Sequence, residues 1–212
     1  MATVTDYNTL KTAIQDWLAR TDIASYTDYF IQLAENQIYG DILSQNEGRG
    51  VKQMEATLSG TISSNAVAVP SDYLALKSAR ISYGGDFYTL EKTTEEIIYT
   101  LHPSQSSSGI PKLIAHVGSN FVFGPYADSA YTLTGTYWSK ATALSSSNTT
   151  TWMTSDIPDI LLAACMGAAA EFVRDDGELQ KWGNFYTKSL AGFIAQDKAA
   201  QYSGSALMIR SM

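Results

Sequence analysis

Hydrophobic residues recur every three or four positions at the start of the chain, which predicts two helices there. The first is expected over residues 7–20 with Thr5 or Asp6 as its N-cap. The second begins near residue 26 and ends in the polar stretch 46–50. The residues predicted to face inward are Leu10, Ile14, Trp17 and Leu18 in the first helix, and Tyr29, Phe30, Leu33, Ala34, Ile38 and Ile42 in the second.

The same spacing returns in residues 156–201 and predicts two further helices. Asp156 suits the N-cap of the first, and Pro158 suits its first turn, where the missing N–H has no cost. The run 160–170 is apolar on nearly every side, so we expect this helix to be buried.

A tight break separates these two helices. Gly177 suits a left-handed turn, and Asp175 or Asp176 suits the cap of the following helix, which ends near Gln201. The apolar stripe of that helix is predicted to consist of Leu179, Trp182, Phe185, Tyr186, Leu190, Phe193 and Ile194.

The middle of the chain changes to short alternating stretches, which predict about six or seven antiparallel strands. Glycine-containing turns at 84–86 and 118–120 each separate two β-prone runs, so each predicts a hairpin. Residues 93–96 have the pattern of a capping box for a short helix over 97–101. A polar linker, 143–151, leads back to the helices.

These patterns together predict an α+β fold. The N- and C-terminal helix pairs form a helical bundle, and an antiparallel β-region is inserted between them. The expected divisions are N-terminal helices over 1–50, a β-rich region over 51–150, C-terminal helices over 151–201 and a flexible tail over 202–212. A chain of 212 residues can bury a core of sufficient size without disulfides.

The net charge of −7 is unevenly distributed. Residues 1–47 carry seven acids and two bases, residues 151–212 carry seven and five, and residues 48–150 carry seven of each. Because binding to nucleic acid requires a face rich in Lys and Arg, this distribution argues against an electrostatic grip on DNA. It is compatible with a surface past which DNA slides without sticking.

Catalytic and metal-binding patterns are weak, so we expect no enzyme activity and no cofactor. His102 and His116 are the only histidines, and Cys165 lies among small apolar residues as a core side chain would. Acids at 175–176 and Glu178 could bind a cation, but a solvated helix junction is the favoured interpretation.

Targeting signals are also lacking in the sequence. Residues 1–6 have neither the basic nor the apolar region of a signal peptide. The longest apolar run, 160–170, is shorter than the roughly 20 residues that a membrane helix needs. We therefore expect a soluble protein, made in a cytoplasm, without membrane contact.

Several short motifs follow one another in a characteristic order between residues 5 and about 200. They are Trp17-Leu18, the run 30–38 (FIQLAENQI), the run 69–74 (VPSDYL), Tyr137-Trp138, the run 152–159 (WMTSDIPD) and the Ala-rich segment after it. In this order they resemble the head-to-tail adaptor proteins of tailed bacteriophages. The resemblance implies a virion protein of the neck, made in the host cytoplasm. It further implies a ring, usually of twelve subunits, beneath the portal protein and around the DNA channel, with a tail or nozzle protein downstream.

The C-terminal residues 202–212 are a candidate portal tether, because the tails of such adaptors commonly reach the portal. The candidate portal-binding residues are Tyr202, Leu207, Met208, Ile209 and Arg210. We expect Leu207 and Ile209 to be buried in a portal groove and Arg210 to meet an acid there. The alternative is an end without a role, which is common at chain termini.

Aromatic residues of the β-region allow two interpretations. Those considered are Phe123, Tyr126, Tyr131, Tyr137 and Trp138. They could form a sugar-stacking surface, which would make the β-region a carbohydrate-binding module in another virion or tail subunit. The favoured interpretation is that they fill the core and subunit contacts, where Tyr and Trp offer large areas with one polar group. A sugar site would need two or three coplanar rings open to solvent.

Overall fold

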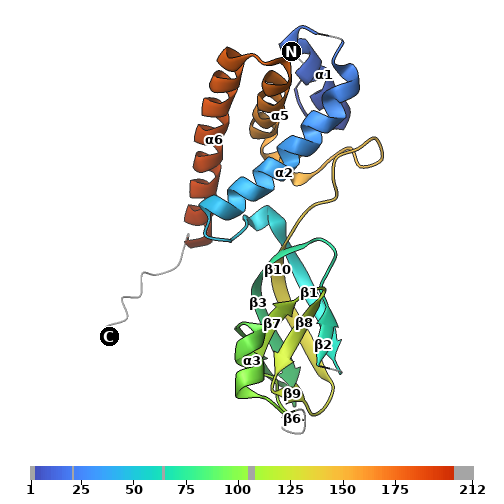
Figure 1. The fold of residues 1–212 in the computed structure, drawn as a ribbon, viewed down its shortest axis with the longest axis vertical. Helices are drawn as coiled ribbons and strands as arrows, with labels where there is room; N and C mark the ends of the chain where they lie inside the picture. Colours follow the sequence, from blue (N-terminus) through green and yellow to red (C-terminus); the bar gives the residue numbers. More distant parts are fainter. Residues whose placement is uncertain (1–2, 21, 64, 105–107, 203–212) are drawn as a thin grey trace, which may run out of the picture. The chain divides into compact units, whose positions relative to one another are not determined.

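The computed structural model contains two compact units (Figure 1). It describes residues 3–20, 22–63, 65–104 and 108–202. A helical unit comprises Met1–Gln53 and Ala141–Met212, and a β-unit comprises Met54–Lys140. Helices and largely antiparallel sheets in one chain confirm the predicted α+β class.

The helical unit is built around a central buried helix, α5. Its helices are α1 (Tyr7–Leu18), α2 (Thr27–Gln45), α4 (Trp152–Asp156), α5 (Pro158–Val173) and α6 (Asp176–Tyr202), with 3-10 turns η1 (Ala24–Tyr26) and η2 (Lys52–Met54) at the ends of connecting segments. Helix α5 packs against α1, α2, α4 and α6. Its buried residues include Ala163, Ala164, Ala169 and Ala170. The predicted burial of this helix is therefore confirmed. Its small side chains let the neighbouring backbones come close.

Helix α1 starts as its sequence predicts. The Asp6 carboxylate accepts a hydrogen bond of 2.8 Å from the Thr9 N–H, and the Thr9 hydroxyl accepts one of 2.9 Å from the Asp6 N–H. This reciprocal pair is a capping box that satisfies two otherwise free donors. The helix ends at Leu18, before the predicted residue 20, because Ala19 adopts a left-handed conformation with φ of 49°.

The start of α5 differs from the prediction in one respect. Pro158 occupies the first turn as expected, but Asp156 is not the N-cap; Ile157 holds that position. Asp156 is instead the last residue of the short helix α4. That helix forms because the Thr154 hydroxyl accepts a hydrogen bond of 3.0 Å from the Thr151 N–H.

The break between α5 and α6 also uses a different residue from the one predicted. Arg174, with φ of 59°, adopts the left-handed conformation, whereas Gly177 lies inside α6. The Asp175 N–H donates back to the Ala170 carbonyl at 3.0 Å, which fixes the turn three positions earlier than predicted. The predicted cap at Asp175 is confirmed, since its carboxylate accepts a hydrogen bond of 3.1 Å from the Glu178 N–H.

The apolar stripes of the helices are narrower than predicted. The predicted inward residues that are buried include Leu10, Ile14, Phe30, Ala34, Ile38, Ile42, Trp182, Tyr186, Leu190 and Ile194. The predictions for Trp17, Tyr29, Leu33 and Phe185 are wrong, because these side chains are 42%, 55%, 39% and 46% exposed, respectively. Helix α2 packs mainly against α5, so the apolar side chains Tyr29 and Leu33 on another side of α2 remain partly exposed.

The β-unit consists of two four-stranded sheets and a short helix. Its elements are β1 (Glu55–Ile62), β2 (Ala66–Ala68), β3 (Tyr73–Tyr83), β4 (Asp86–Thr89), β5 (Glu91–Lys92), α3 (Glu95–Leu101), β6 (Ser108–Gly109), β7 (Leu113–Val117), β8 (Asn120–Gly124), β9 (Tyr126–Ala127) and β10 (Tyr131–Ser139). The strand orders are β1-β10-β3-β4 and β2-β8-β7-β5, and β6 pairs with β9. Buried side chains from both four-stranded sheets, such as Leu58, Ile81 and Phe121, form one core.

Both predicted hairpins are confirmed, β3–β4 and β7–β8. Their turns contain Gly84, Gly85 and Gly118, all with positive φ, which a glycine adopts without strain. Two short pairings, β5–β7 and β6–β9, are parallel, which the sequence pattern did not predict. The predicted capping box before α3 is also wrong, because the N-cap Thr94 makes no capping hydrogen bond through its side chain.

Candidate protein-binding surfaces

The residues considered for catalysis lie on different elements of the fold and do not form a cluster. Cys165 is fully buried in α5, and burial raises the pKa of its thiol far above the usual range. His102 follows the last turn of α3, and His116 lies on β7 with its ring 5.1 Å from that of Tyr73. The described part of the chain contains no group of three or more His, Cys, Asp or Glu side chains that could hold a metal ion.

The acids at the α5–α6 junction are engaged in local structure. The Asp175 carboxylate caps α6, as described above. The Glu178 carboxylate accepts a hydrogen bond of 2.9 Å from the indole N–H of Trp182 and forms an ion pair of 3.2 Å with Lys181. These contacts support the interpretation of this segment as a helix junction.

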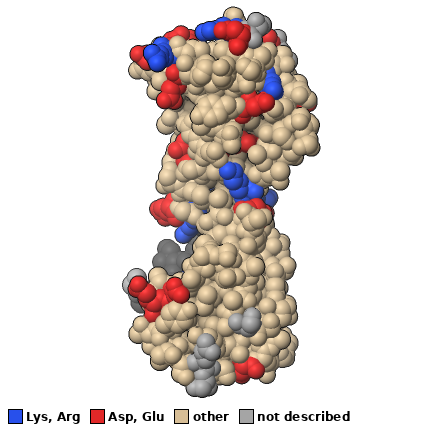
Figure 2. Space-filling view, turned by 45° about the vertical axis from the view of Figure 1, so that its right-hand side comes forward, with Lys and Arg blue, Asp and Glu red and all other residues tan. Residues whose placement is uncertain are grey.

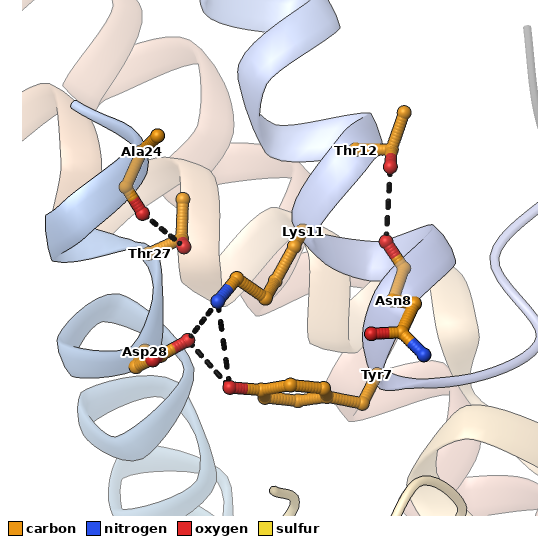
Figure 3. A network of polar contacts seen from close by, with 7 residues as sticks. All are labelled: Tyr7, Asn8, Lys11, Thr12, Ala24, Thr27 and Asp28. Carbon is orange, nitrogen blue, oxygen red and sulfur yellow. Dashed lines mark hydrogen bonds and ion pairs between the residues drawn. The ribbon is translucent and has the colours of Figure 1, made fainter. Parts of the chain in front are cut away.

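Ion pairs with acids neutralise both bases of residues 1–47. One of these pairs belongs to a network of polar contacts between α1 and α2 (Figure 3). Lys11 Nζ lies 2.6 Å from Asp28 Oδ1, and the Tyr7 hydroxyl donates to the same oxygen at 2.6 Å. The hydrogen bond from Lys11 holds the pKa of Asp28 below its usual value. Arg20 is paired with Asp22 at 2.6 Å. Both bases of residues 1–47 are thus already matched by acids.

Charged side chains of both signs are scattered over the face of the molecule shown in Figure 2. No continuous area of Lys and Arg appears on that face, and the part that belongs to the β-unit is mostly uncharged. Such a surface lacks the electrostatic footprint that duplex DNA requires for tight binding.

The segment that re-enters the helical unit after β10 is fixed on α2. The Tyr39 hydroxyl oxygen accepts hydrogen bonds from the Ala141 N–H at 2.8 Å and the Trp152 indole N–H at 3.3 Å. The buried Glu35 carboxylate accepts one of 3.1 Å from the Leu144 N–H. These contacts hold the predicted linker in one path, so it contributes to a defined surface.

One exposed apolar area, which we term the α2–α5 face, lies on the helical unit. It contains Tyr26, Tyr29 and Leu33 at helical spacing, together with Phe172 from α5. Tyr26, Tyr29 and Phe172 are each about half exposed, and the rings of Tyr26 and Phe172 lie 4.8 Å apart. Large apolar side chains grouped in this way are typical of a surface that binds another protein.

A groove of about 310 Å³ continues this face between α2, α5 and α6. Leu33, Ala168 and Glu171 are among its lining residues, together with Gly167 and Gly183. A methyl group added at either glycine would meet no atom within 4 Å, so the floor is open. The groove therefore has room above these glycines for a side chain from outside.

A second apolar area, which we term the α6 flank, lies on another side of α6. Phe185 is 46% exposed there, beside a hollow of about 470 Å³ that Ile160, Lys188 and Gly192 help to line. The hollow shares no lining residue with the groove. At about 100° per residue, Gly183 in the groove and Lys188 in the hollow lie roughly 140° apart around the helix axis.

The aromatic residues considered for sugar binding do not form an open surface. Phe123, Tyr131, Tyr137 and Trp138 are all buried, and Tyr126 is half-buried. The exposed rings of the β3–β4 hairpin are divided between two sides: Phe87 pairs with Ser82 on one face, whereas Tyr83 and Tyr88 lie on the other face, with the buried Ile81. Phe87 therefore cannot stack on one sugar together with either tyrosine, because it lies on the opposite face of the sheet.

The candidate tether residues cannot be placed on either surface. Leu207, Met208, Ile209 and Arg210 lie outside the described residues, as does the side chain of Tyr202. The backbone of Tyr202 is the last residue of α6. In the part of the chain that is described, no helix has the length and apolar character needed to cross a membrane.

Comparison with known families decides what these surfaces belong to. A family model described as "SU10 adaptor protein" matches residues 5–209, almost the whole chain. The chain belongs to the SU10 adaptor protein family. This is a family of phage head-to-tail adaptors, so the resemblance inferred from the motifs is confirmed. The adaptor is a structural component of a virion. No curated protein matches it.

An adaptor functions by binding other proteins, and the α2–α5 face and the α6 flank offer apolar area for such contacts. Neither surface was predicted from the sequence, because Tyr29, Leu33 and Phe185 were expected in the core. One signal could have indicated them. The predicted stripes were wider than the face that one helix presents to a single neighbour, so part of each stripe had to remain uncovered.

Proposed function

We propose that this adaptor forms a ring, of twelve copies as the family resemblance implies, beneath the portal in the neck of the virion. It joins the portal to the next tail or nozzle protein and continues the DNA channel. The observation that carries this proposal is the family match over residues 5–209. The exposed apolar areas of the helical unit support it, because a ring subunit needs lateral and axial contacts.

Charge supports passage of DNA without specific binding. Acids exceed bases by seven to two in residues 1–47, and both bases there form ion pairs with acids. A channel wall lined by such helices would repel phosphate groups and prevent DNA from sticking during packaging and ejection.

The same excess of acid opposes ring closure in the free protein. Subunits of equal sign repel one another, so we propose that the ring assembles on the portal as a template. The C-terminal tether, with Leu207, Ile209 and Arg210, is proposed to provide the attachment.

The test uses purified portal rings and the purified full chain. Native mass measurement should show the adaptor alone as a monomer or weak oligomer at low micromolar concentration. Adding portal should give a complex with one adaptor per portal subunit. A stable dodecamer without portal would contradict templated assembly, and the absence of any complex would contradict the adaptor role on this portal.

DNA binding is tested separately with labelled duplex DNA. Fluorescence anisotropy at 50 mM and 200 mM salt should show no tight binding by the isolated subunit. Tight binding that weakens steeply with salt would mean that several phosphates are contacted, and would contradict passive passage.

A further inference from the structure

We propose that neighbouring copies of this chain contact one another head-to-tail, with the α6 flank of one copy inserted against the α2–α5 face of the next. Phe185 enters the groove beside Leu33, and Lys188 pairs with Glu171 of the neighbouring copy. This inference rests on the proposed function, because it assigns the lateral contact of the ring.

The helical unit carries two unlike apolar areas, the α2–α5 face and the α6 flank. A two-fold contact would place one area against itself and leave the other exposed to water. A head-to-tail contact covers both areas in every copy, and such contacts close into a ring when the rotation per subunit divides a full turn. The two areas on different sides of α6 therefore fit a second copy of this chain.

The α6 flank and the groove are complementary in shape. The α6 flank presents a large, half-exposed ring at Phe185. The groove offers open space above Gly167 and Gly183, next to the apolar side chain of Leu33. Aromatic side chains that fill a pocket of the partner are the usual anchors of protein interfaces. Glycine and alanine in the groove floor allow the inserted ring to approach the helix backbones.

One side chain of each area carries a charge opposite to that of its counterpart. Glu171 lines the groove and directly precedes Phe172, whereas Lys188 follows Phe185 by three residues and so lies on the same side of α6. Neither charged side chain forms an ion pair with another described residue. Asp156 and Asp159 line the same hollow as Lys188. Insertion of Phe185 into the groove brings Lys188 to Glu171 of the neighbouring copy, and this pairing fixes the register of the contact.

Disulfide trapping tests the contact. Glu171→Cys and Lys188→Cys are made as separate single variants, since the native Cys165 is fully buried. In one set of samples, each variant by itself is bound to portal rings and oxidised. In a second set, the two variants are mixed before they are bound to portal rings and oxidised. A cross-linked dimer is expected in the mixture only. The matched control replaces Glu171→Cys by Ser59→Cys, an exposed position on β1, and should give no cross-link with Lys188→Cys.

Each outcome decides the proposal. A dimer formed by either variant alone would indicate a two-fold contact and overturn the head-to-tail arrangement. No dimer in the mixture, at a portal occupancy equal to that of the wild type, would also overturn it. If the wild type does not bind portal, the same oxidation is done at high protein concentration without portal. A dimer formed only in the mixture would then support the proposed contact but contradict assembly of the ring on the portal. The absence of a dimer would contradict both proposals.

Charge reversal gives an independent readout. Lys188→Glu and Glu171→Lys each place like charges at every contact, so each should lower the affinity for portal-bound neighbours by about tenfold. The double variant restores opposite charges and should recover wild-type occupancy. Thermal unfolding should be unchanged in all three, because both side chains are exposed. Loss in the double variant equal to that in the single variants would exclude the pair.

Discussion

The hydroxyl of Tyr186 on α6 donates a hydrogen bond of 2.7 Å to the carboxylate of Asp41 on α2. Tyr186 is only 5% exposed, and its burial, together with the acceptor Asp41, raises the pKa of the phenol well above its ordinary value. The bond links the second helix of the chain to the last one across 145 residues of sequence. The bond therefore connects the N-terminal and C-terminal helices of the helical unit directly.

Replacing Tyr186 by Phe should lower the free energy of unfolding of the helical unit by about 1–3 kcal/mol, because Asp41 loses its donor in a partly buried setting. Urea denaturation followed by far-UV circular dichroism measures this change. The matched control is Tyr29→Phe, which alters an exposed phenol and should stay within about 0.5 kcal/mol of the wild type. Equal effects of the two substitutions would show that the Tyr186 bond contributes nothing.

Alkaline pH should destabilise the β-unit through Tyr137. Burial and a hydrogen bond of 2.9 Å to Asp72 raise the pKa of Tyr137 to about 12. The folded state keeps this proton at pH values where the unfolded chain, with a tyrosine pKa of about 10, has released it. The contribution of Tyr137 to stability is thus fully present below about pH 10 and is lost as the pH rises from there toward 12.

Denaturation midpoints of the wild type and of Tyr137→Phe, measured from pH 8 to pH 11.5, test this expectation. The variant is less stable at pH 8 but should lose less stability on raising the pH. Tyr29→Phe serves as the control and should follow the wild-type curve. A variant curve parallel to that of the wild type would mean that Tyr137 does not titrate with folding.

Two glycines should respond to alanine with opposite sign. At Gly135 on β10 a Cβ would lie 2.4 Å from the backbone carbonyl oxygen of Ser78, so Gly135→Ala must disturb the pairing of β10 with β3. We expect a loss of about 3 kcal/mol or more. Gly183 lies inside α6 with open space around it, and Gly183→Ala should stabilise the helix by about 0.5–1 kcal/mol. Thermal unfolding of both variants checks the signs; wild-type stability of Gly135→Ala would contradict the close approach.

The elements of this fold were predictable where a local signal determines them. The N-cap Asp6, the first-turn Pro158 and the glycines of the β3–β4 turn are each recognisable from their nearest neighbours in the sequence. The partner of Asp6 in the capping box, Thr9, was not predicted. Which of several nearby residues forms a given cap or turn was harder to predict from the sequence. Gly177 suited the left-handed turn by residue type, but the hydrogen bond from Asp175 to Ala170 placed that turn at Arg174.

The candidate binding surfaces were harder to predict, because periodicity shows which residues share a helix face and not which neighbour covers them. Tyr29, Leu33 and Phe185 continue apolar stripes, yet no described part of the chain covers them fully. The polar contacts that shape the helical unit have the same property. Glu35 and Leu144 are 109 residues apart, and no local pattern relates them.

The last prediction concerns the proposed tether. The buried residues of α6, such as Trp182, Leu190 and Ile194, all precede residue 202. Deleting residues 207–212 therefore removes no contact described within the helical unit, and thermal unfolding should be unchanged. Burial of Leu207 and Ile209 in a portal groove would contribute about 3–5 kcal/mol per subunit before ordering costs. Repetition around a ring makes such a weak attachment strong through effective concentration.

The truncated chain should consequently remain folded but fail to attach to portal-bearing heads, which co-sedimentation measures. Leu207→Ala with Ile209→Ala keeps the chain length and should show the same failure, because it removes the apolar contacts alone. Arg210→Ala should weaken attachment less, since one exposed ion pair contributes at most about 1 kcal/mol. If the truncated chain occupies portal as fully as the wild type, the tether hypothesis is wrong, and the exposed faces of the helical unit must carry the attachment.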